Sequence, residues 1–369
     1  MITAYTDAAV FTGEKFIQHQ VVLVKDGIVK DILPAAQLPA EVPIVDCANK
    51  YLVPAFIDLQ IYGAAGKLFS AYPSVAALQL LAQHNAGSGT ASCLVTIATQ
   101  PKATIVACIE AIKSYWQQGC KGIMGMHLEG PFINAEKRGA HVKDWVVSPT
   151  LGAVKSLLQN AGGVIKMVTL APECVDEKVI QLFVENGVIV SIGHSNATFA
   201  EATNAMNNGA TTVTHLYNAM SPLHHREPGL VGAAMQHPKA TASIIADGLH
   251  VAYEAVKIAK QIMGDRLFFI TDAVTETTIG PYQHVLNTDH YDLSNGILSG
   301  SALTMILAVQ NAVSYCNTSL EEALKMASLY PAKVMGWQHR LGKIEKGYTA
   351  SFSLIDKDLS AATITGGAW

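Results

Sequence analysis

The sequence is poor in charged residues and lacks the features that mark several classes of protein. Asp, Glu, Lys and Arg make up only 15% of its 369 residues. Even so, no apolar run reaches the roughly 18 residues that a membrane-spanning helix needs. The net charge is −4, and no cluster of Lys and Arg indicates a nucleic-acid-binding surface. The N-terminus, "MITAYTDAAVFTGEKF", has neither the basic nor the apolar part of a signal peptide. We therefore expect neither a membrane nor a nucleic-acid partner.

The cysteines form no recognisable motif. None of the six belongs to a C-x-x-C pair, and most lie in apolar segments: Cys47, Cys93, Cys108, Cys120, Cys174 and Cys316. This pattern favours reduced core thiols over a disulfide framework or a zinc knuckle. We accordingly expect a cytoplasmic protein.

Eight short apolar runs recur along the middle of the chain, and most are followed by a helix-like segment. Runs without alternation are typical of strands that are buried on both faces. They are 51–61, 91–99, 122–132, 165–173, 188–195, 210–220, 242–250 and 267–274. Alternating strands and helices predict a parallel sheet, and eight units predict an α/β fold with a closed (β/α)8 barrel of the TIM type. An open doubly wound sheet is the alternative, but "GAAG" (63–66) is too weak to serve as its phosphate loop.

The two ends of the chain differ from this middle part. Asp26-Gly27 separates two short apolar runs, which predicts a β-hairpin. Residues 341–369 are also short β-like runs broken by glycines. We therefore expect three segments: residues 1–50 and 337–369 together form a small β-sandwich domain, and residues 51–336 form the barrel. Within the barrel segment, helices are expected at 74–89, 103–119, 196–210, 301–316 and 319–336.

Polar side chains stand at the ends of several predicted strands, and in a barrel these ends converge on one mouth. Glu129, His194 and His215 come from separate strands, and two imidazoles with one carboxylate suit a catalytic Zn²⁺ that keeps an open position for water. Asp272 follows the last strand and can take a proton from that water and return it. Each of these residues alone is more often a structural cap or a hydrogen-bonded core residue. Their convergence on one face favours a catalytic site.

The connection after the sixth strand, "HLYNAMSPLHHREPGLVGA" (215–233), is longer than the fold requires, which indicates function or partner contact. Its Arg226 can bind a phosphate with two hydrogen bonds. Pairing with the neighbouring Glu227 on the surface is an equally good interpretation of this arginine.

Several motifs together resemble one family. "HLEGPF", "GHSNAT", "THLYNAMSPLHHREPG", "IADGLH", "TDAV" and "LSGSALTM" occur in this order, and the resemblance extends along nearly the whole chain. The sequence resembles the N-acetylglucosamine-6-phosphate deacetylases of the amidohydrolase superfamily. That resemblance implies metal-dependent hydrolysis of the acetamide to glucosamine 6-phosphate and acetate.

The resemblance also implies roles for individual residues. Glu129, His194 and His215 would hold the metal, and Asp272 would be the general base and acid. The substrate-binding residues would be Ala140, His141, Asn218, Ala219, Arg226, His250, Leu298, Ser299 and Gly300. Of these, Asn218, Ala219 and Arg226 would receive the phosphate, and His250 would help to polarise the acetamide carbonyl. Family members are generally homodimers, so the phosphate site can include the neighbouring chain.

One feature departs from many metal-dependent hydrolases, in which the first barrel strand ends in His-x-His. In "FIDLQIYG" these two positions hold Gln60 and Tyr62. An amide and a phenol are poor ligands, so we expect one divalent metal per chain. Zn²⁺ suits the ligands best, but Fe²⁺, Co²⁺ or Mn²⁺ can occupy the same set. The alternatives are a deacetylase of N-acetylgalactosamine 6-phosphate and a catalytically silent sugar-phosphate-binding protein.

Overall fold

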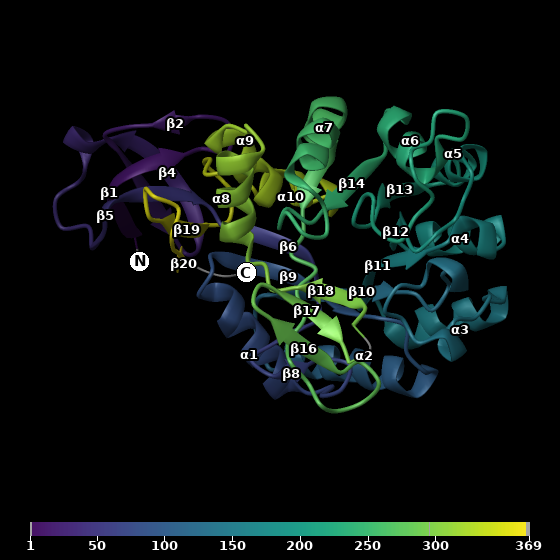
Figure 1. Ribbon diagram of the computed structural model, residues 1–369. Helices are drawn as coiled ribbons and strands as arrows, with labels where there is room; N and C mark the ends of the chain where they lie inside the picture. The colour runs from purple at the N-terminus through teal and green to yellow at the C-terminus, as the bar shows by residue number, and fades with distance from the viewer. Residues whose placement is uncertain (1, 295, 367–369) are drawn as a thin grey trace.

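The computed structural model describes residues 2–294 and 296–366, and the two ends of the chain meet in one β-sheet (Figure 1). Its strands are β1 (Ile2–Phe11), β2 (Phe16–Ile17), β3 (Gln20–Lys25), β4 (Ile28–Pro34), β5 (Ile44–Pro54), β19 (Ser351–Ile355) and β20 (Ala362–Gly366). They pair in the order β20-β19-β5-β1-β3-β4, with β2 added to β1. Asp26 and Gly27 join β3 to β4 with φ angles of 50° and 76°, as a type I′ hairpin requires. The small β domain expected from both termini is confirmed, and its strands belong to a single sheet.

Eight parallel strands form the barrel, and each coincides with a predicted apolar run. They are β6 (Phe56–Ile61), β9 (Thr90–Ile97), β10 (Ile123–Glu129), β11 (Ile165–Leu170), β12 (Ile189–Ile192), β13 (Ala210–Val213), β14 (Thr241–Ile244) and β15 (Leu267–Phe269). Each strand pairs with the next along the chain. Beyond β15, the Asp272 amide donates to the Gln60 carbonyl and the Tyr62 amide donates to the Ala273 carbonyl, each over 2.9 Å. These bonds join the first strand to the last, so the (β/α)8 barrel is confirmed.

Helices surround the barrel, and their ends follow from local capping. They are α1 (Val75–Ala86), α2 (Lys102–Gln117), α3 (Leu151–Ala161), α4 (Glu177–Glu185), α5 (Phe199–Asn207), α6 (Gly229–Gln236), α7 (Tyr253–Met263), α8 (Met305–Tyr315), α9 (Leu320–Ala327) and α10 (Leu329–Val334). Short 3₁₀ helices are η1 (Ala35–Gln37), η2 (Ala135–Lys137), η3 (Lys143–Trp145), η4 (Pro172–Cys174) and η5 (Gly264–Arg266). Helix α5 begins later than Asn196 because Thr198 and Glu201 form a capping box. The single helix expected at 319–336 is divided at Ser328 into α9 and α10.

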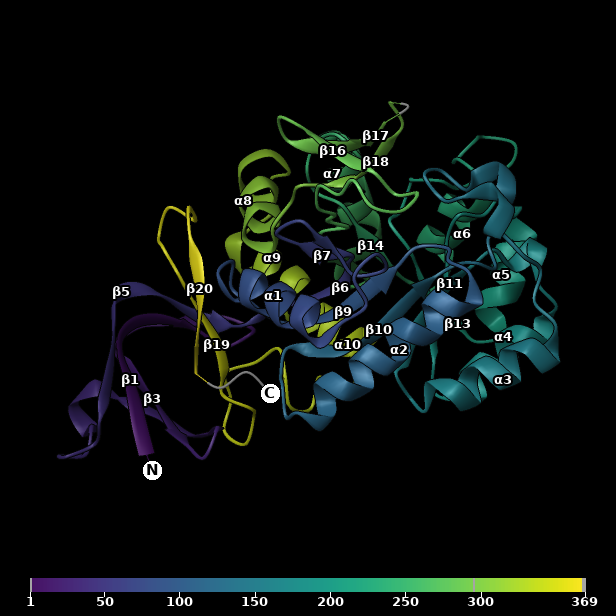
Figure 2. The same ribbon diagram turned by 90° about the horizontal axis from the view of Figure 1, so that it is seen from below.

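A three-stranded antiparallel sheet follows the last barrel strand, in a segment for which the motifs predict no detail. It consists of β16 (His284–Asn287), β17 (His290–Leu293) and β18 (Leu298–Ser301), and Figure 2 shows it standing above the barrel strands. A short hairpin, β7 (Gly63–Ala64) and β8 (Lys67–Leu68), follows β6. Tyr62, Leu68, Val274 and Tyr282 form a small buried cluster that links these segments. The sheet therefore adds a wall at the mouth of the barrel.

The described part of the chain contains no helix that is both long enough and apolar enough to cross a membrane.

Candidate active site

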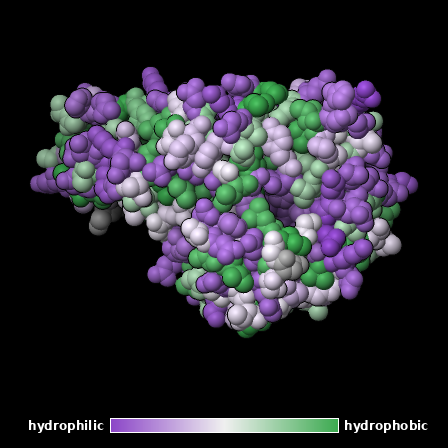
Figure 3. All heavy atoms as spheres, in the orientation of Figure 1, coloured by the Kyte–Doolittle hydropathy of each residue, from purple (hydrophilic) through white to green (hydrophobic). Residues whose placement is uncertain are grey.

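A cavity of about 320 Å³ lies between the carboxyl ends of the barrel strands and the sheet β16–β18. The space-filling view of this face shows a hollow with hydrophilic and hydrophobic residues on its rim (Figure 3). The predicted residues that line the cavity are Glu129, Ala140, His141, His194, His215, Asn218, Ala219, His250, Asp272, Leu298 and Ser299. The structure therefore brings together most of the predicted site.

Three of the four residues predicted to bind the metal or transfer the proton have backbone conformations that L-amino acids rarely adopt. The φ angle is 47° at His194, 37° at His215 and 54° at Asp272. Each lies just beyond a barrel strand, where the chain turns away from the sheet. Such conformations typically cost about 1–3 kcal/mol each and gather at functional sites.

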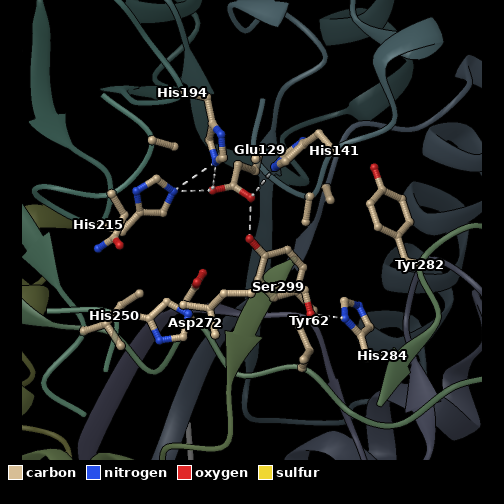
Figure 4. Close-up of a pocket in the computed structure, with 18 of the residues that line it drawn as sticks. Tyr62, Glu129, His141, His194, His215, His250, Asp272, Tyr282, His284 and Ser299 are labelled. Carbon is tan, nitrogen blue, oxygen red and sulfur yellow. Dashed lines mark hydrogen bonds and ion pairs between the residues drawn. The ribbon is translucent and has the colours of Figure 1, made fainter. Parts of the chain in front are cut away.

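Glu129, His194 and His215 bring three ligand atoms together (Figure 4). Glu129 Oε1 lies 3.3 Å from His194 Nε2 and 3.1 Å from His215 Nε2, and the two nitrogens are 3.0 Å apart. The ligands of a tetrahedral zinc ion, each at about 2.0–2.2 Å, are roughly 3.3–3.6 Å from one another. The triangle is therefore close to the size that such an ion requires.

The position of the proton on the His194 ring also supports a metal ion at this triangle. His194 Nδ1 lies 2.9 Å from the Lys137 carbonyl, which can only accept, so the neutral ring carries its proton on Nδ1. Nε2 then presents a lone pair toward the Glu129 carboxylate and His215. Atoms with lone pairs repel at these distances unless a proton or a metal ion lies between them. A divalent cation therefore suits this group of atoms.

His141 approaches the same carboxylate but offers a different group. Glu129, His141 and His194 place ligand atoms within 4.8 Å of one another. However, the Thr99 amide donates to His141 Nδ1 over 3.1 Å, so the neutral ring carries its proton on Nε2. That N–H donates to Glu129 Oε2 over 3.2 Å. Burial, followed by the neighbouring His194, lowers the pKa of His141 to about 4, which keeps the ring neutral. His141 is thus a hydrogen-bond donor at the cavity wall.

Gln60 and Tyr62 contact the two central carboxylates. Gln60 Nε2 lies 2.8 Å from Glu129 Oε1 and 2.6 Å from Asp272 Oδ1, and the Tyr62 hydroxyl donates to Glu129 Oε2. All four side chains are at least nine-tenths buried. Burial and then the charge of Glu129 raise the pKa of Tyr62 well above its usual range, so the phenol remains a neutral donor.

The two carboxyl groups differ in their proton affinity. Burial opposes ionisation of Glu129, but the neighbouring His194, followed by His141 and His215, holds its pKa well below its usual range. Burial, followed by the charges of Glu129 and Asp58, raises the pKa of Asp272 well above its usual range. Glu129 is therefore the permanent anion, and Asp272 is the group able to hold a proton. Such a division is typical of acid–base sites.

His250 is oriented by Asp247, a residue of the same IADGLH motif to which the sequence assigns no role. Its Nδ1 lies 2.6 Å from Asp247 Oδ2, and the Asp247 side chain also accepts the His250 amide over 2.8 Å. Because Nδ1 donates to Asp247, only Nε2 of His250 remains to interact with a molecule in the cavity.

Two predicted substrate residues do not line the cavity. Arg226 is exposed on the 215–233 connection, away from the lining residues of its own chain. Gly300 lies in β18 behind the lining, where an added Cβ would approach Val274 Cγ1 to 2.7 Å and the Asp272 carbonyl oxygen to 3.1 Å. Its role is therefore to let β18 pass close to the segment that carries Asp272.

Several residues in the cavity are not predicted from the sequence. Among the described lining residues, Lys137 is the only lysine or arginine, and its Nζ lies 3.2 Å from the Met220 carbonyl. Tyr282 and His284 come from the unpredicted segment, and His284 Nδ1 bonds Ser299 Oγ over 2.9 Å (Figure 4). No spacing or motif in the sequence signals Tyr282 and His284, because the path of the 275–300 segment decides where they lie.

Two family models match the chain. The model of the amidohydrolase family matches residues 51–368, and the model of the NagA composite domain matches residues 3–51. An N-acetylglucosamine-6-phosphate deacetylase of Haemophilus influenzae is 33% identical over an alignment of 380 positions, which covers 99% of this chain and 98% of that protein. The Danio rerio deacetylase of the same name is 37% identical, covering 86% of this chain and 83% of its own. An N-acetylgalactosamine-6-phosphate deacetylase of Escherichia coli O157:H7 is 32% identical, with 96% and 95% covered.

Solved structures agree with these sequence matches. The N-acetylglucosamine-6-phosphate deacetylase of Pasteurella multocida superposes with a TM-score of 0.94 at 33% identity, over 100% of both chains. A mutant of the Mycobacterium smegmatis enzyme, in complex with N-acetyl-D-glucosamine-6-phosphate, gives 0.90 at 26% identity, over 99% of this chain and 97% of that one. The chain therefore belongs to the amidohydrolase family, within the group of N-acetylglucosamine-6-phosphate deacetylases.

Proposed function

We propose that this enzyme hydrolyses the acetamide of N-acetylglucosamine 6-phosphate and releases acetate and glucosamine 6-phosphate. The observation that carries the proposal is the convergence of Glu129, His194, His215 and Asp272 on one cavity. The names of the full-length relatives support this substrate. Metal-assisted hydrolysis of an amide requires a metal site and a proton-transfer group side by side.

We assign the metal site to Glu129 Oε1, His194 Nε2 and His215 Nε2, because these atoms form the triangle described above. One divalent cation fits there, preferably Zn²⁺, with Fe²⁺, Co²⁺ or Mn²⁺ as substitutes. When bound, the cation would lower the pKa of a water molecule and polarise the acyl carbonyl.

The remaining steps belong to side chains of this protein. Asp272 accepts the proton of the attacking water and then gives it to the departing amine, in keeping with its raised pKa. His250 is held through Nδ1 by Asp247, and its Nε2, when it carries a proton, would donate to the acyl oxygen as negative charge develops there. His141 borders the cavity as well, and its N–H holds Glu129 Oε2.

The phosphate would bind near Asn218 and Ala219. Asn218 Nδ2 is a buried donor that has no hydrogen-bond partner within the described part of the chain. Lys137 Nζ contacts the carbonyl of Met220, the next residue but one, which places a positive charge beside the same segment. An amide donor and an ammonium group side by side are suited to a phosphate dianion.

We further propose that the enzyme is a cytoplasmic homodimer. Arg226 is exposed and does not line the cavity of its own chain, so it would contribute to phosphate binding in the neighbouring chain. Leu223, on the same connection, is 55% exposed, which is consistent with a contact between subunits.

N-acetylgalactosamine 6-phosphate is the second candidate substrate, since one similar relative carries that name. The two sugars differ only at the C4 hydroxyl, and measured kcat/KM values for both would distinguish them. A catalytically silent binder is the third possibility, although every group that the hydrolysis requires is present.

The test is acetate release from N-acetylglucosamine 6-phosphate by the wild type and by Asp272→Asn, with metal content measured in the same preparations. We expect about one metal per chain in both proteins, and a kcat that falls at least about 100-fold in the variant. A metal-loaded wild type that releases no acetate would exclude this substrate. Release that Asp272→Asn leaves unchanged would exclude Asp272 as the base.

A further inference from the structure

The two oxygens of the Glu129 carboxylate have different partners. Oε1 faces His194 and His215, at 3.3 and 3.1 Å. Oε2 accepts from the Tyr62 hydroxyl and from His141 Nε2 (Figure 4). Both lone-pair directions of Oε2 are therefore taken by donors, while Oε1 is turned toward the imidazole pair.

Gln60 joins Glu129 to Asp272. Its Nε2 has two hydrogens and three neighbours: Glu129 Oε1 at 2.8 Å, Asp272 Oδ1 at 2.6 Å and the Tyr62 hydroxyl at 3.0 Å. The Tyr62 proton goes to Glu129, and Glu129 Oε1 and Asp272 Oδ1 both lie within acceptor distance, so the two amide hydrogens belong to the carboxyl groups. The amide thus separates two buried acidic groups that would otherwise repel each other.

The backbone fixes both donors in place. Gln60 lies in β6 and Tyr62 follows the strand, and the Tyr62 amide donates to the Ala273 carbonyl over 2.9 Å. The Tyr62 ring packs against Leu68, Val274 and Tyr282 in the small buried cluster. The two donors are consequently held at the same carboxylates by the strand that closes the barrel.

We propose that Gln60 and Tyr62 are positioning residues that take the place of a second cation. Gln60 bridges Glu129 and Asp272, and Tyr62 holds Glu129 Oε2, so that Glu129 offers a single oxygen to one metal ion. The inference rests on the proposed function only in assuming that a metal binds at Glu129, His194 and His215. The site then binds one metal ion because of the hydrogen-bond donors beside the ligands, and not only because of the ligands themselves.

Tyr62→Phe tests this proposal because it removes one hydroxyl and retains the packed ring. We expect the metal to bind about 10- to 100-fold more weakly, the usual effect of losing a hydrogen bond to a metal ligand. In the Co²⁺-loaded protein, the visible absorption spectrum should also shift, because Glu129 Oε2 becomes able to turn toward the ion. Metal affinity would be measured by competition with a chelator, and melting temperature would report the folding of each variant.

Tyr282→Phe is the matched control, because Tyr282 belongs to the same buried cluster but donates to the Thr99 carbonyl rather than to Glu129. Its metal affinity and Co²⁺ spectrum should match those of the wild type. If Tyr62→Phe also matches the wild type in both measurements, Tyr62 does not position Glu129 and the proposal is wrong. That result would leave the proposed reaction intact, whereas a wild type that binds no metal would contradict the proposed function itself.

A second variant tests the exclusion of another cation. Gln60→His combined with Tyr62→His removes both donors and adds two imidazoles beside Glu129 Oε2 and Asp272. We expect the metal content of this folded variant to rise from about one to about two per chain. A folded double variant that still binds one metal would show that Gln60 and Tyr62 do not exclude the second.

Discussion

Lys137 offers the sharpest test of how this cavity recognises a phosphorylated sugar. It is the only lysine or arginine among the described lining residues, and its ammonium group lies beside the segment that carries Asn218 and Ala219. Replacing it by methionine removes the charge but retains most of the side-chain volume. The backbone carbonyl of Lys137, which fixes the His194 ring over 2.9 Å, remains in place. The substitution therefore changes the charge at one end of the cavity and leaves the metal ligands oriented.

The size of the effect follows from the position of Lys137. A hydrogen bond that involves a charged group contributes about 1.5–3 kcal/mol when it is well formed. Lys137 is half-buried, so water screens part of its charge and the lower part of that range applies. A loss of roughly 1.5–2 kcal/mol corresponds to a rise of about 10- to 30-fold in KM for the 6-phosphate.

The assay compares KM and kcat for N-acetylglucosamine 6-phosphate and for unphosphorylated N-acetylglucosamine. Lys137→Met should raise KM for the phosphorylated sugar only, with kcat nearly unchanged, because the lost contact is made equally in the ground and transition states. Lys143→Met is the control, since Lys143 is an exposed lysine on the same connection that does not line the cavity. An equal loss with both sugars would show that Lys137 supports the site in general, and an unchanged KM would refute its role in phosphate binding.

Two further predictions concern residues outside the cavity. Arg226→Ala should raise KM for the 6-phosphate in a protein that sediments as a dimer; a monomeric enzyme with unchanged KM would contradict the shared site. Burial raises the pKa of Asp58 from 3.8 to about 6, so its ionised form destabilises the folded state as the pH rises through this window. Asp58→Asn lacks this cost, and urea unfolding should show it gaining about 2 kcal/mol relative to the wild type between about pH 4.5 and 7, whereas a pH-independent difference would show that the fold does not raise the pKa of Asp58.

Much of this architecture can be predicted from the sequence because burial restricts which residue types can occupy a strand. Strands that are covered on both faces must be apolar throughout, so the eight runs identify the barrel without any motif. The polar residues at their ends then stand out against the apolar background, which is why Glu129, His194, His215 and Asp272 can be selected before the fold is known. The hairpin at Asp26-Gly27 is predictable for a similar reason, since its two φ angles are accessible to few residue types.

Other parts of the site depend on packing between distant segments, and no pattern of residue types in the sequence predicts them. The sheet β16–β18 has exposed, mixed side chains, so it has neither a continuous apolar run nor a helical period. Tyr282 and His284 enter the cavity only because this sheet folds back over the barrel. The substitution of His-x-His by Gln60 and Tyr62 indicates a missing pair of ligands, but the sequence does not show that both residues donate to the carboxylates.

The backbone at the candidate ligands gives an independent argument that the site is functional. His194, His215 and Asp272 all have φ angles between 37° and 54°, where a side chain is disfavoured and glycine is the least costly residue. A fold that needed only the turns could place glycines there, as it does at Gly139 and Gly248, whose φ angles are 55° and 80°. The chain instead has two imidazoles and a carboxylate at these positions, and their polar groups meet around one carboxylate, Glu129. Because the rest of the barrel must offset the cost of these conformations, the side chains themselves, and not the turns, explain why these residues occur there.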